Sequence, residues 1–202
     1  MDPSKAIFAA DELLGKNEKV ILARASANDL PFEDQSFDFV CSIGVLHHIP
    51  DTFKALKACV DKVKRGGYFY TYLYYNLDKR GLLFKILFKL VNGVRSVVSK
   101  FPGRLKKMTC DVLAIIIYMP LILWVRLLVF VGLRGLAKQM PLSAYNNKSF
   151  FIIRNDVLDR FGTRLEHRFS EEEVEKMMQN CGLTDIKISP GIPYYHAIGR
   201  RV

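Results

Sequence analysis

Short hydrophobic runs alternate with helical patterns over the first 75 residues. Three runs have the length and continuity of strands: residues 20–25 (VILARA), 37–45 (FDFVCSIGV) and 68–74 (YFYTYLY). We expect the first two to be buried parallel strands, because few polar residues interrupt them. Between the second and third runs, Asp51 precedes apolar residues at helical spacing, which predicts a helix that ends at the glycine pair 66–67. The order strand, helix, strand predicts α/β crossover units.

Helix boundaries and a final strand pair are marked by residue type. Residues 4–14 predict a helix, with Asp2 as its N-cap and Gly15 at its end, and Ser170 with Glu173 has the spacing of a capping box. The other elements expected after residue 150 are a helix from Asn155 to Phe161, a helix end at Cys181 and Gly182, and strands over 184–189 and 194–199 joined by Pro190 and Gly191. The two strands predict an antiparallel pair that closes a sheet.

The central part of the chain is the most apolar. Polar positions recur at helical spacing over residues 82–99, which predicts an amphipathic helix with a narrow cationic stripe. Residues 112–125 then carry no charge, and Arg126 and a further apolar run follow. A membrane-spanning helix needs about 20 uninterrupted apolar residues. Because Pro120 and Arg126 fall inside this window, the sequence does not favour a span.

The positive charge of the chain is confined to this central part. The formal net charge is +10, and residues 76–150 hold 13 Lys and Arg against two acids, whereas the rest of the chain is close to balanced. In one interpretation the segment is a helical subdomain with solvated lysines. In the other, a basic amphipathic surface contacts an anionic membrane or covers a lipid-like substrate. Nucleic acid is not expected as a partner, because the aromatic residues lie among Leu and Ile and not among arginines.

The cysteines indicate a reducing compartment. The four cysteines have no CxxC spacing, and no signal segment opens the chain. Neither a disulfide framework nor a zinc site is therefore expected. We expect a cytoplasmic location, with peripheral contact at the inner face of the membrane as the consequence of the membrane interpretation.

The segment SANDLPFEDQSFDFVCSIGVLHHIPD (26–51), followed by KVKRGGYFY (62–70), resembles class I S-adenosylmethionine-dependent methyltransferases of the type 11-like group. The resemblance covers about residues 1–75, with weaker support over 155–202. It implies an α/β fold with an incomplete Rossmann-like doubly wound sheet, strands three to seven of that family, and a helical insert. The implied domains are a partial core (1–75), a basic apolar insert that acts as a lid or membrane-docking element (76–150), and a C-terminal helix and strand pair (151–202).

The resemblance also assigns a cofactor site for S-adenosylmethionine. The cofactor-binding residues that it implies are Asp2, Ser26, Ala27, Asn28, Ser42 and Gly44. Asp2 matches the acid whose carboxylate accepts hydrogen bonds from the ribose hydroxyls. Ser26 stands where the family has an acid beside the adenine, so that contact is weakened or replaced. Ser42 and Gly44 lie at the carboxyl end of a strand, where ligands of open α/β sheets bind.

The same resemblance places the methyl acceptor near two histidines. His47 and His48 directly follow the strand that ends near Ser42, and one of them would act as a general base or orienting group. The alternative is that both are structural loop residues, since positioning alone can supply much of the rate of a methyl transfer. Tyr75 and Asn76 are the expected acceptor-site residues. The acceptor itself is expected to be a small or lipid-like molecule.

One part of the family pattern has no counterpart in these residues. Class I methyltransferases place a glycine-rich GxGxG turn before the acid that aligns with Asp2, and this sequence has no such turn there. We therefore expect an amino-terminally truncated methyltransferase whose cofactor binding is impaired. The alternative is a non-catalytic membrane-associated protein that retains a degenerate methyltransferase scaffold. Whether the chain is an enzyme stays open between these two.

Overall fold

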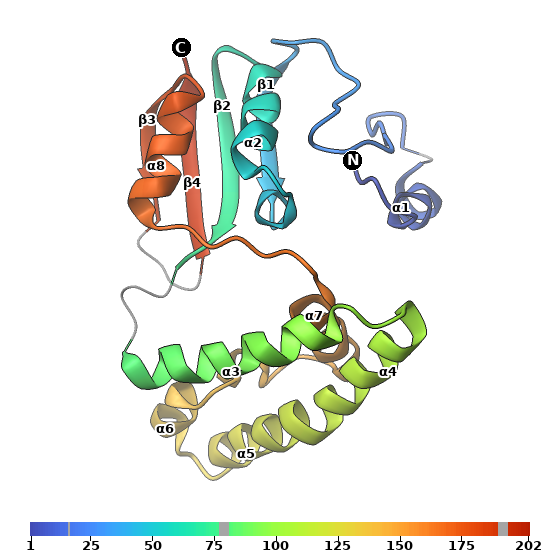
Figure 1. Cartoon of the computed structure of the whole chain (residues 1–202), viewed down its shortest axis with the longest axis vertical. Coiled ribbons are helices and arrows are strands. Elements are labelled where there is room, and N and C mark those ends of the chain that lie inside the picture. Colours follow the sequence, from blue (N-terminus) through green and yellow to red (C-terminus); the bar gives the residue numbers. More distant parts are fainter. Residues whose placement is uncertain (16, 77–80, 190–193) are drawn as a thin grey trace. The chain divides into compact units, whose positions relative to one another are not determined.

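The computed structural model describes residues 1–15, 17–76, 81–189 and 194–202, and the chain divides into two compact units (Figure 1). We call Met1–Lys79 together with Leu165–Val202 the sheet unit, and Arg80–Arg164 the helical unit. The helical unit thus interrupts a unit built from both ends of the chain. It extends 14 residues beyond position 150, where the sequence places the end of the insert.

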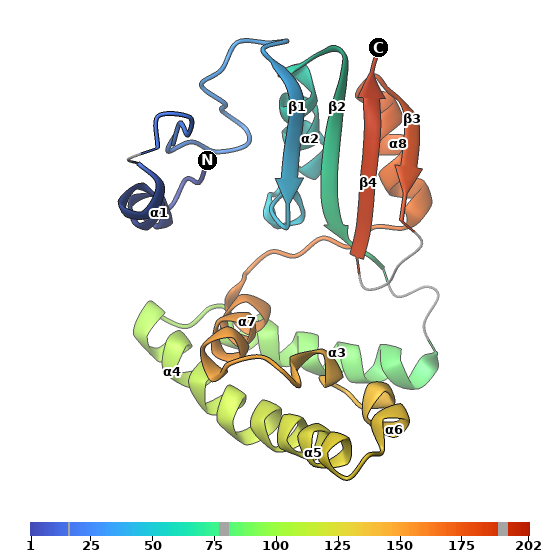
Figure 2. The same cartoon turned by 180° about the vertical axis from the view of Figure 1, so that it is seen from behind.

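A four-stranded mixed sheet forms the centre of the sheet unit (Figures 1 and 2). Its order is β1 (Phe37–Ile43), β2 (Val63–Tyr74), β4 (Tyr194–Arg201), β3 (Leu183–Ile188). β1 and β2 are parallel, with Ser42 opposite Thr71, whereas β2 with β4 and β4 with β3 are antiparallel. The α/β fold class and the closing antiparallel pair are therefore confirmed. Pro190 and Gly191, expected between these two strands, lie outside the described residues.

Helices α2 (Thr52–Asp61) and α8 (Glu171–Asn180) cover one face of the sheet (Figures 1 and 2). The side chain of Asp51 accepts from the Lys54 amide, and Ser170 with Glu173 forms the expected capping box. Side chains of β2 alternate between the two faces of the sheet. Phe69, Thr71 and Leu73 are fully buried on the helix side, so the intervening tyrosines of β2 lie on the opposite face.

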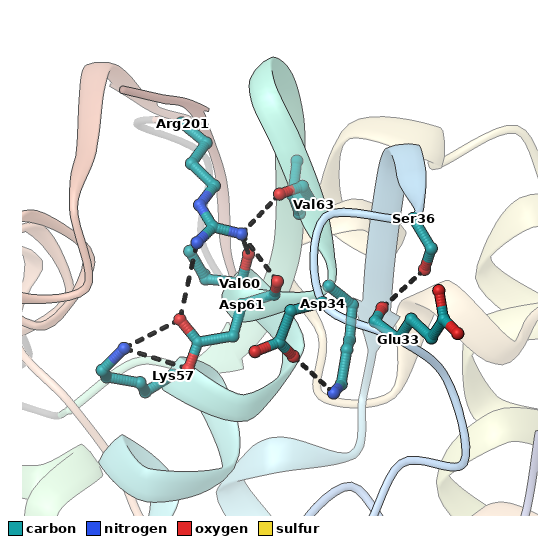
Figure 3. Close-up of polar contacts among 9 residues, drawn as sticks. Glu33, Asp34, Ser36, Lys57, Val60, Asp61, Val63 and Arg201 are labelled. Carbon is teal, nitrogen blue, oxygen red and sulfur yellow. Dashed lines mark hydrogen bonds and ion pairs between the residues drawn. The ribbon is translucent and has the colours of Figure 1, made fainter.

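The last strand is tied to the α2–β2 connection by one arginine (Figure 3). From a single nitrogen, Nη1, Arg201 of β4 donates to the carbonyl oxygens of Val60, Asp61 and Val63. The carboxylate of Asp61 also accepts from Lys57 at 2.8 Å, one helical turn away. Because the last carbonyls of a helix have no partner within the helix, this guanidinium satisfies groups that would otherwise need water.

β1 and β2 approach closely at one glycine. A Cβ atom at Gly67 would lie 2.6 Å from the backbone oxygen of Asp38 in β1 and 2.9 Å from the Val63 side chain. No side chain fits such a gap. The glycine pair 66–67, expected at the end of α2, therefore belongs to β2, and α2 ends at Asp61.

Four further local expectations were wrong. Residues 20–25 are extended but form no strand, because no described strand lies beside them to complete a ladder. β1 is parallel as expected, yet most of its side chains are exposed. α1 (Ala6–Leu14) begins at Ala6 without a side-chain cap, since Asp2 engages Ser4 in a local turn. α7 (Phe150–Gly162) begins well before Asn155, because Ser149 caps it through the Ile152 amide.

The helical unit packs its helices around two apolar clusters. Its other elements are α3 (Leu82–Val98), α4 (Gly103–Leu113), a π-helical turn (Ala114–Tyr118), α5 (Met119–Phe130), α6 (Arg134–Gln139) and a 3₁₀ turn (Ser143–Tyr145). The larger cluster joins Val98, Tyr118, Ile122 and Phe161, among others. Arg154 of α7 makes a two-point ion pair with Asp111 of α4. The amphipathic helix expected over residues 82–99 is confirmed as α3.

One continuous helical stretch, Gly103–Phe130, is long and apolar enough to cross a membrane by length and composition. Its most apolar window of 18 residues has a mean hydropathy of 2.5, and 28% of that window is buried. The two residues that argue against a span in the sequence do not break the helix. Pro120 directly follows the π-helical turn Ala114–Tyr118, so the irregular hydrogen-bond spacing of that turn coincides with the missing N–H of the proline. Arg126 donates to the carbonyls of Asn146 and Lys148.

Candidate functional site

A cavity of about 460 Å³ lies in the sheet unit between the first 30 residues and β1. One wall is formed by β1, including Phe39, Cys41 and Ile43, and the other by the extended segment that contains Ile21 and Ala23. Both walls are apolar and open, since Ile21 is 85% exposed, Ile43 61% and Phe39 53%. A backbone hydrogen bond from Asp2 to Ala23 fixes the beginning of the chain against the extended segment.

Two of the six cofactor residues expected from the sequence line this cavity, and the other four do not. Ser42 and Ala27 line it directly. The other four are each adjacent in sequence to a lining residue: Asp2 beside Pro3, Ser26 and Asn28 on either side of Ala27, and Gly44 beside Ile43. Pockets of this size are typical of small-molecule sites. The structure thus brings residues from three separate stretches of sequence to one cavity.

The polar groups at this cavity are held by short local contacts. The Ser4 hydroxyl and backbone N–H hydrogen-bond to the carboxylate of Asp2 and lower its pKa below the usual range, so the group is ionised at neutral pH. Ser26 accepts from the amides of Asn28 and Asp29 through its hydroxyl and its carbonyl. Gly44 has a φ of +72°, a conformation that side chains rarely adopt, and this lets the chain turn sharply after β1.

His47 is completely buried at the end of β1, in the 3₁₀ turn Leu46–His48. Its ring stacks on Tyr74, with ring centroids 3.9 Å apart, and neither ring nitrogen has a hydrogen-bond partner. Burial is the main cause that lowers the pKa of His47 to about 3, and the neighbouring His48 and Arg168 make smaller contributions in the same direction. His47 is therefore a neutral packing residue in this conformation, as in the structural alternative from the sequence.

His48 is positioned differently from its neighbour. Its Nδ1 lies 2.8 Å from the carbonyl oxygen of Leu165 and its ring is only partly buried. Because a carbonyl can only accept, Nδ1 must carry the proton in this contact. In the neutral ring, Nε2 then has a free lone pair and can accept a proton. Of the two histidines, His48 has the chemistry of a general base.

Tyr75 and Asn76 extend β2 towards a segment from the C-terminal part of the chain. The amide of Asn76 donates to the carbonyl of Phe169 at 2.7 Å, and Tyr75 forms an isolated parallel bridge with Phe169. The ring of Tyr75 is 8% exposed and belongs to the apolar core. Its side chain therefore contributes to packing, and these two residues do not line the cavity beside β1.

The sequence interpretation did not identify the charged segment that surrounds the histidine pair. Arg168 pairs with Glu166 at 2.6 Å, donates to the carbonyl of Tyr75, and lies over the ring of Tyr74 at 5.2 Å from its centroid. The amide of His167 donates to the carbonyl of His47 at 2.8 Å. In the sequence, the only indication of this segment is that Glu166, His167 and Arg168 stand together just before the capping box. Over the described ranges, no group of three or more His, Cys, Asp or Glu side chains could hold a metal ion.

Residues 1–71 match the methyltransferase domain family. The curated 27-O-demethylrifamycin SV methyltransferase of Amycolatopsis mediterranei (strain S699) is 33% identical over 51 residues, which are 25% of this chain and 19% of that protein. The chain thus matches only about a fifth of the length of this relative.

Solved structures resemble the whole chain in fold. A SAM-dependent methyltransferase of Thermotoga maritima is 16% identical with a TM-score of 0.50, over 99% of this chain and 71% of that one. Human N-acetylserotonin methyltransferase, solved in complex with SAM, is 13% identical with a TM-score of 0.50, over 99% and 39%. At these identities the likeness concerns the fold, and that fold is Rossmann-like.

Proposed function

Because residues 1–71 match the methyltransferase domain family, we propose that this chain binds S-adenosylmethionine and takes part in methyl transfer to a small or lipid-like acceptor. The main observation in favour of the proposal is that Ser42, Ala27 and the two neighbours of Asp2, Met1 and Pro3, line one cavity. This cavity runs along parallel strand β1 from Phe37 to Ile43 and so includes its carboxyl end, where ligands of open α/β sheets bind.

The residues at the cavity suit the nucleoside half of this cofactor. The ionised carboxylate of Asp2 can accept hydrogen bonds from ribose hydroxyls, and charged acceptors form the stronger bonds of this kind. The apolar walls from β1 and from the extended segment can enclose a flat adenine ring. When bound, the cofactor supplies an electrophilic methyl group on a sulfonium.

We assign His48 to the acceptor side of the reaction. The acceptor donates a lone pair to the methyl carbon as the carbon–sulfur bond breaks, and it loses a proton if it is an alcohol or amine. Nε2 of His48 can take that proton, because the contact to Leu165 keeps Nδ1 protonated. His47, buried without solvent exposure, supports the turn and does not act on the acceptor.

Binding is expected to be weak. The chain has no glycine-rich turn after a strand to approach the methionine half of the cofactor. We expect a Kd of about 0.1–1 mM, or roughly −5.5 to −4 kcal/mol. Complete failure to bind would favour the non-catalytic membrane-associated protein instead.

Titration of the whole chain with S-adenosylhomocysteine by calorimetry tests the proposal. Asp2→Ala should weaken binding about tenfold or more, because it removes hydrogen bonds to a charged group. Asp11→Ala, which removes an exposed carboxylate of the nearby helix α1, is the matched control and should leave the Kd unchanged. Equal weakening by both variants, or none by either, would contradict the assignment of Asp2.

The exposed apolar residues of the helical unit are the evidence for a lipid-like acceptor and for peripheral contact with an anionic membrane. α3 exposes Leu82, Leu90 and Val97 at 75%, 66% and 57%, and α5 exposes Trp124 and Phe130. Exposed apolar patches of this kind, set among lysines, are typical of membrane contact sites. We therefore propose a cytoplasmic protein that contacts the inner face of a membrane through this unit.

A further inference from the structure

A second cavity, of about 470 Å³, lies wholly inside the helical unit. Its walls come from α3, the end of α4, the π-helical turn, the start of α5, and the end of α7. Of its twelve lining residues, Arg160 alone carries a charge. The volume falls within the range of small-molecule pockets, and the lining is apolar enough to hold a hydrocarbon chain.

Two irregularities of the backbone shape this cavity. The π-helical turn Ala114–Tyr118 interrupts the α4–α5 helix and contributes Ile117 and Tyr118 to the wall. Leu142, which also lines the cavity, has a φ of +61°, which is unfavourable for a side chain of this kind. π-turns and strained residues both occur preferentially at ligand sites. Here both line the same cavity.

The charged residue lies at the solvent side of the cavity. Arg160 is an exposed residue near the end of α7, one position before the buried ring of Phe161. A carboxylate one turn earlier on the same helix, Asp156, accepts a hydrogen bond from the Tyr145 hydroxyl. Exposed apolar residues of α3, Leu90 and Val94, also line the cavity and mark where it opens.

We propose that this cavity binds a single-chain anionic amphiphile, with the hydrocarbon chain among the apolar walls and the carboxylate or phosphate head paired with Arg160. A planar guanidinium suits such a head because it can donate two parallel hydrogen bonds. The inference goes beyond the proposed function, because it assigns the helical unit a ligand that methyl transfer itself does not require.

A chain-length series tests the proposal on the whole chain. Saturated fatty acids of 8 to 16 carbons are titrated below their critical micelle concentrations. Each methylene that enters the cavity should strengthen binding about fourfold, and the gain should stop when the cavity is full. Dodecyl phosphate, compared with dodecanoate, shows whether the site prefers a phosphate or a carboxylate head group. Dodecanol has the same chain length without a charge and shows how much the charge contributes to binding. An affinity that rises without a plateau, or the absence of saturable binding, would overturn the proposal.

Two variants locate the site. Arg160→Glu should weaken dodecanoate binding at least tenfold and leave dodecanol binding unchanged. Arg104→Glu, an equal change of charge at an exposed position of α4, should have no effect. Val94→Trp fills the mouth from an exposed position and should abolish binding of both compounds. Circular dichroism shows whether each variant is folded. If Val94→Trp does not fold, the binding data for Arg160→Glu alone test whether the amphiphile binds in this cavity. Unchanged binding of dodecanoate by Arg160→Glu would contradict the proposal, and this outcome does not depend on whether the chain binds S-adenosylhomocysteine.

Discussion

The Nδ1 atom of His48 lies 2.8 Å from the carbonyl oxygen of Leu165, a residue 117 positions further along the chain. This contact fixes the tautomer of the His48 ring and leaves Nε2 as the basic nitrogen. It also joins the turn after β1 to the segment that leads into α8. A histidine held in this way can be told apart from a packing histidine by substitution.

His48→Gln should lower methyl transfer about 10²-fold or more, because general-base catalysis contributes that much. Binding of S-adenosylhomocysteine should not change. The measurement is single-turnover transfer of the methyl group to a cell extract or a lipid fraction. His196→Gln, which changes a histidine of β4, is the control. Equal loss in both variants would indicate a general effect on the fold.

His47 should make the protein less stable in acid. Its folded-state pKa of about 3 lies below the ordinary value of 6.5, so the unfolded chain binds the proton first. Its stabilising contribution is therefore complete above pH 6.5 and is lost as the pH falls towards 3. Between pH 7.5 and 5.5 the free energy of unfolding should fall by about 1 kcal/mol from this group.

Urea unfolding of His47→Phe at the two pH values checks this. A phenylalanine can keep the contact with Tyr74 and has no unsatisfied nitrogens, so the variant should be at least as stable at neutral pH. The acid-dependent loss should shrink by about 1 kcal/mol relative to the wild type. The same pH dependence in both proteins would show that His47 does not titrate on unfolding.

Arg201→Met should destabilise the protein by about 1–3 kcal/mol, because three carbonyls lose a common charged donor. The measurement is the free energy of unfolding in urea. Arg65→Met is the matched control, since Arg65 is exposed on β2, and it should change stability by less than about 0.5 kcal/mol. Similar losses in the two variants would show that the guanidinium of Arg201 contributes no more than a surface charge.

Membrane contact through the helical unit should depend on its lysines. Lys89→Glu combined with Lys107→Glu should reduce flotation with phosphatidylglycerol vesicles several-fold, because each basic residue near an anionic surface contributes about 1 kcal/mol. The matched change Lys19→Glu with Lys176→Glu, in the sheet unit, should have little effect. Flotation that depends equally on both pairs would indicate attraction by net charge alone.

The elements that the sequence predicts correctly are those with local signals. α2 and α8 carry side-chain caps, and the apolar runs of β1 and β2 have strand length. Residues 20–25 fail because a strand exists only when a neighbour completes its ladder, which no local pattern reports. The hydrogen bonds from Arg168 and Arg201 to backbone carbonyls span 93 to 141 positions, so single-sequence patterns give no sign of them.

The residues expected at the cofactor site were predicted from a motif, and only the fold shows which of them line a common cavity. Ser42 and Ala27 are 15 positions apart and share its wall. The same reasoning did not separate His47 from His48, because the difference lies in burial and in a partner far along the chain. The motif therefore proposes candidate residues, and the structure shows how their burial and contacts differ.

Alkylation of Cys41 tests the central claim most directly. Cys41 is exposed and lines the cavity beside β1, whereas burial raises the pKa of the Cys59 and Cys181 thiols to about 11 and also raises that of Cys110. Iodoacetamide at pH 7.5 should therefore modify Cys41 in a separate fast phase, which Cys41→Ser removes. Saturating S-adenosylhomocysteine should slow this phase at least fivefold. A rate of Cys41 alkylation that stays unchanged at saturation would contradict a cofactor site in this cavity.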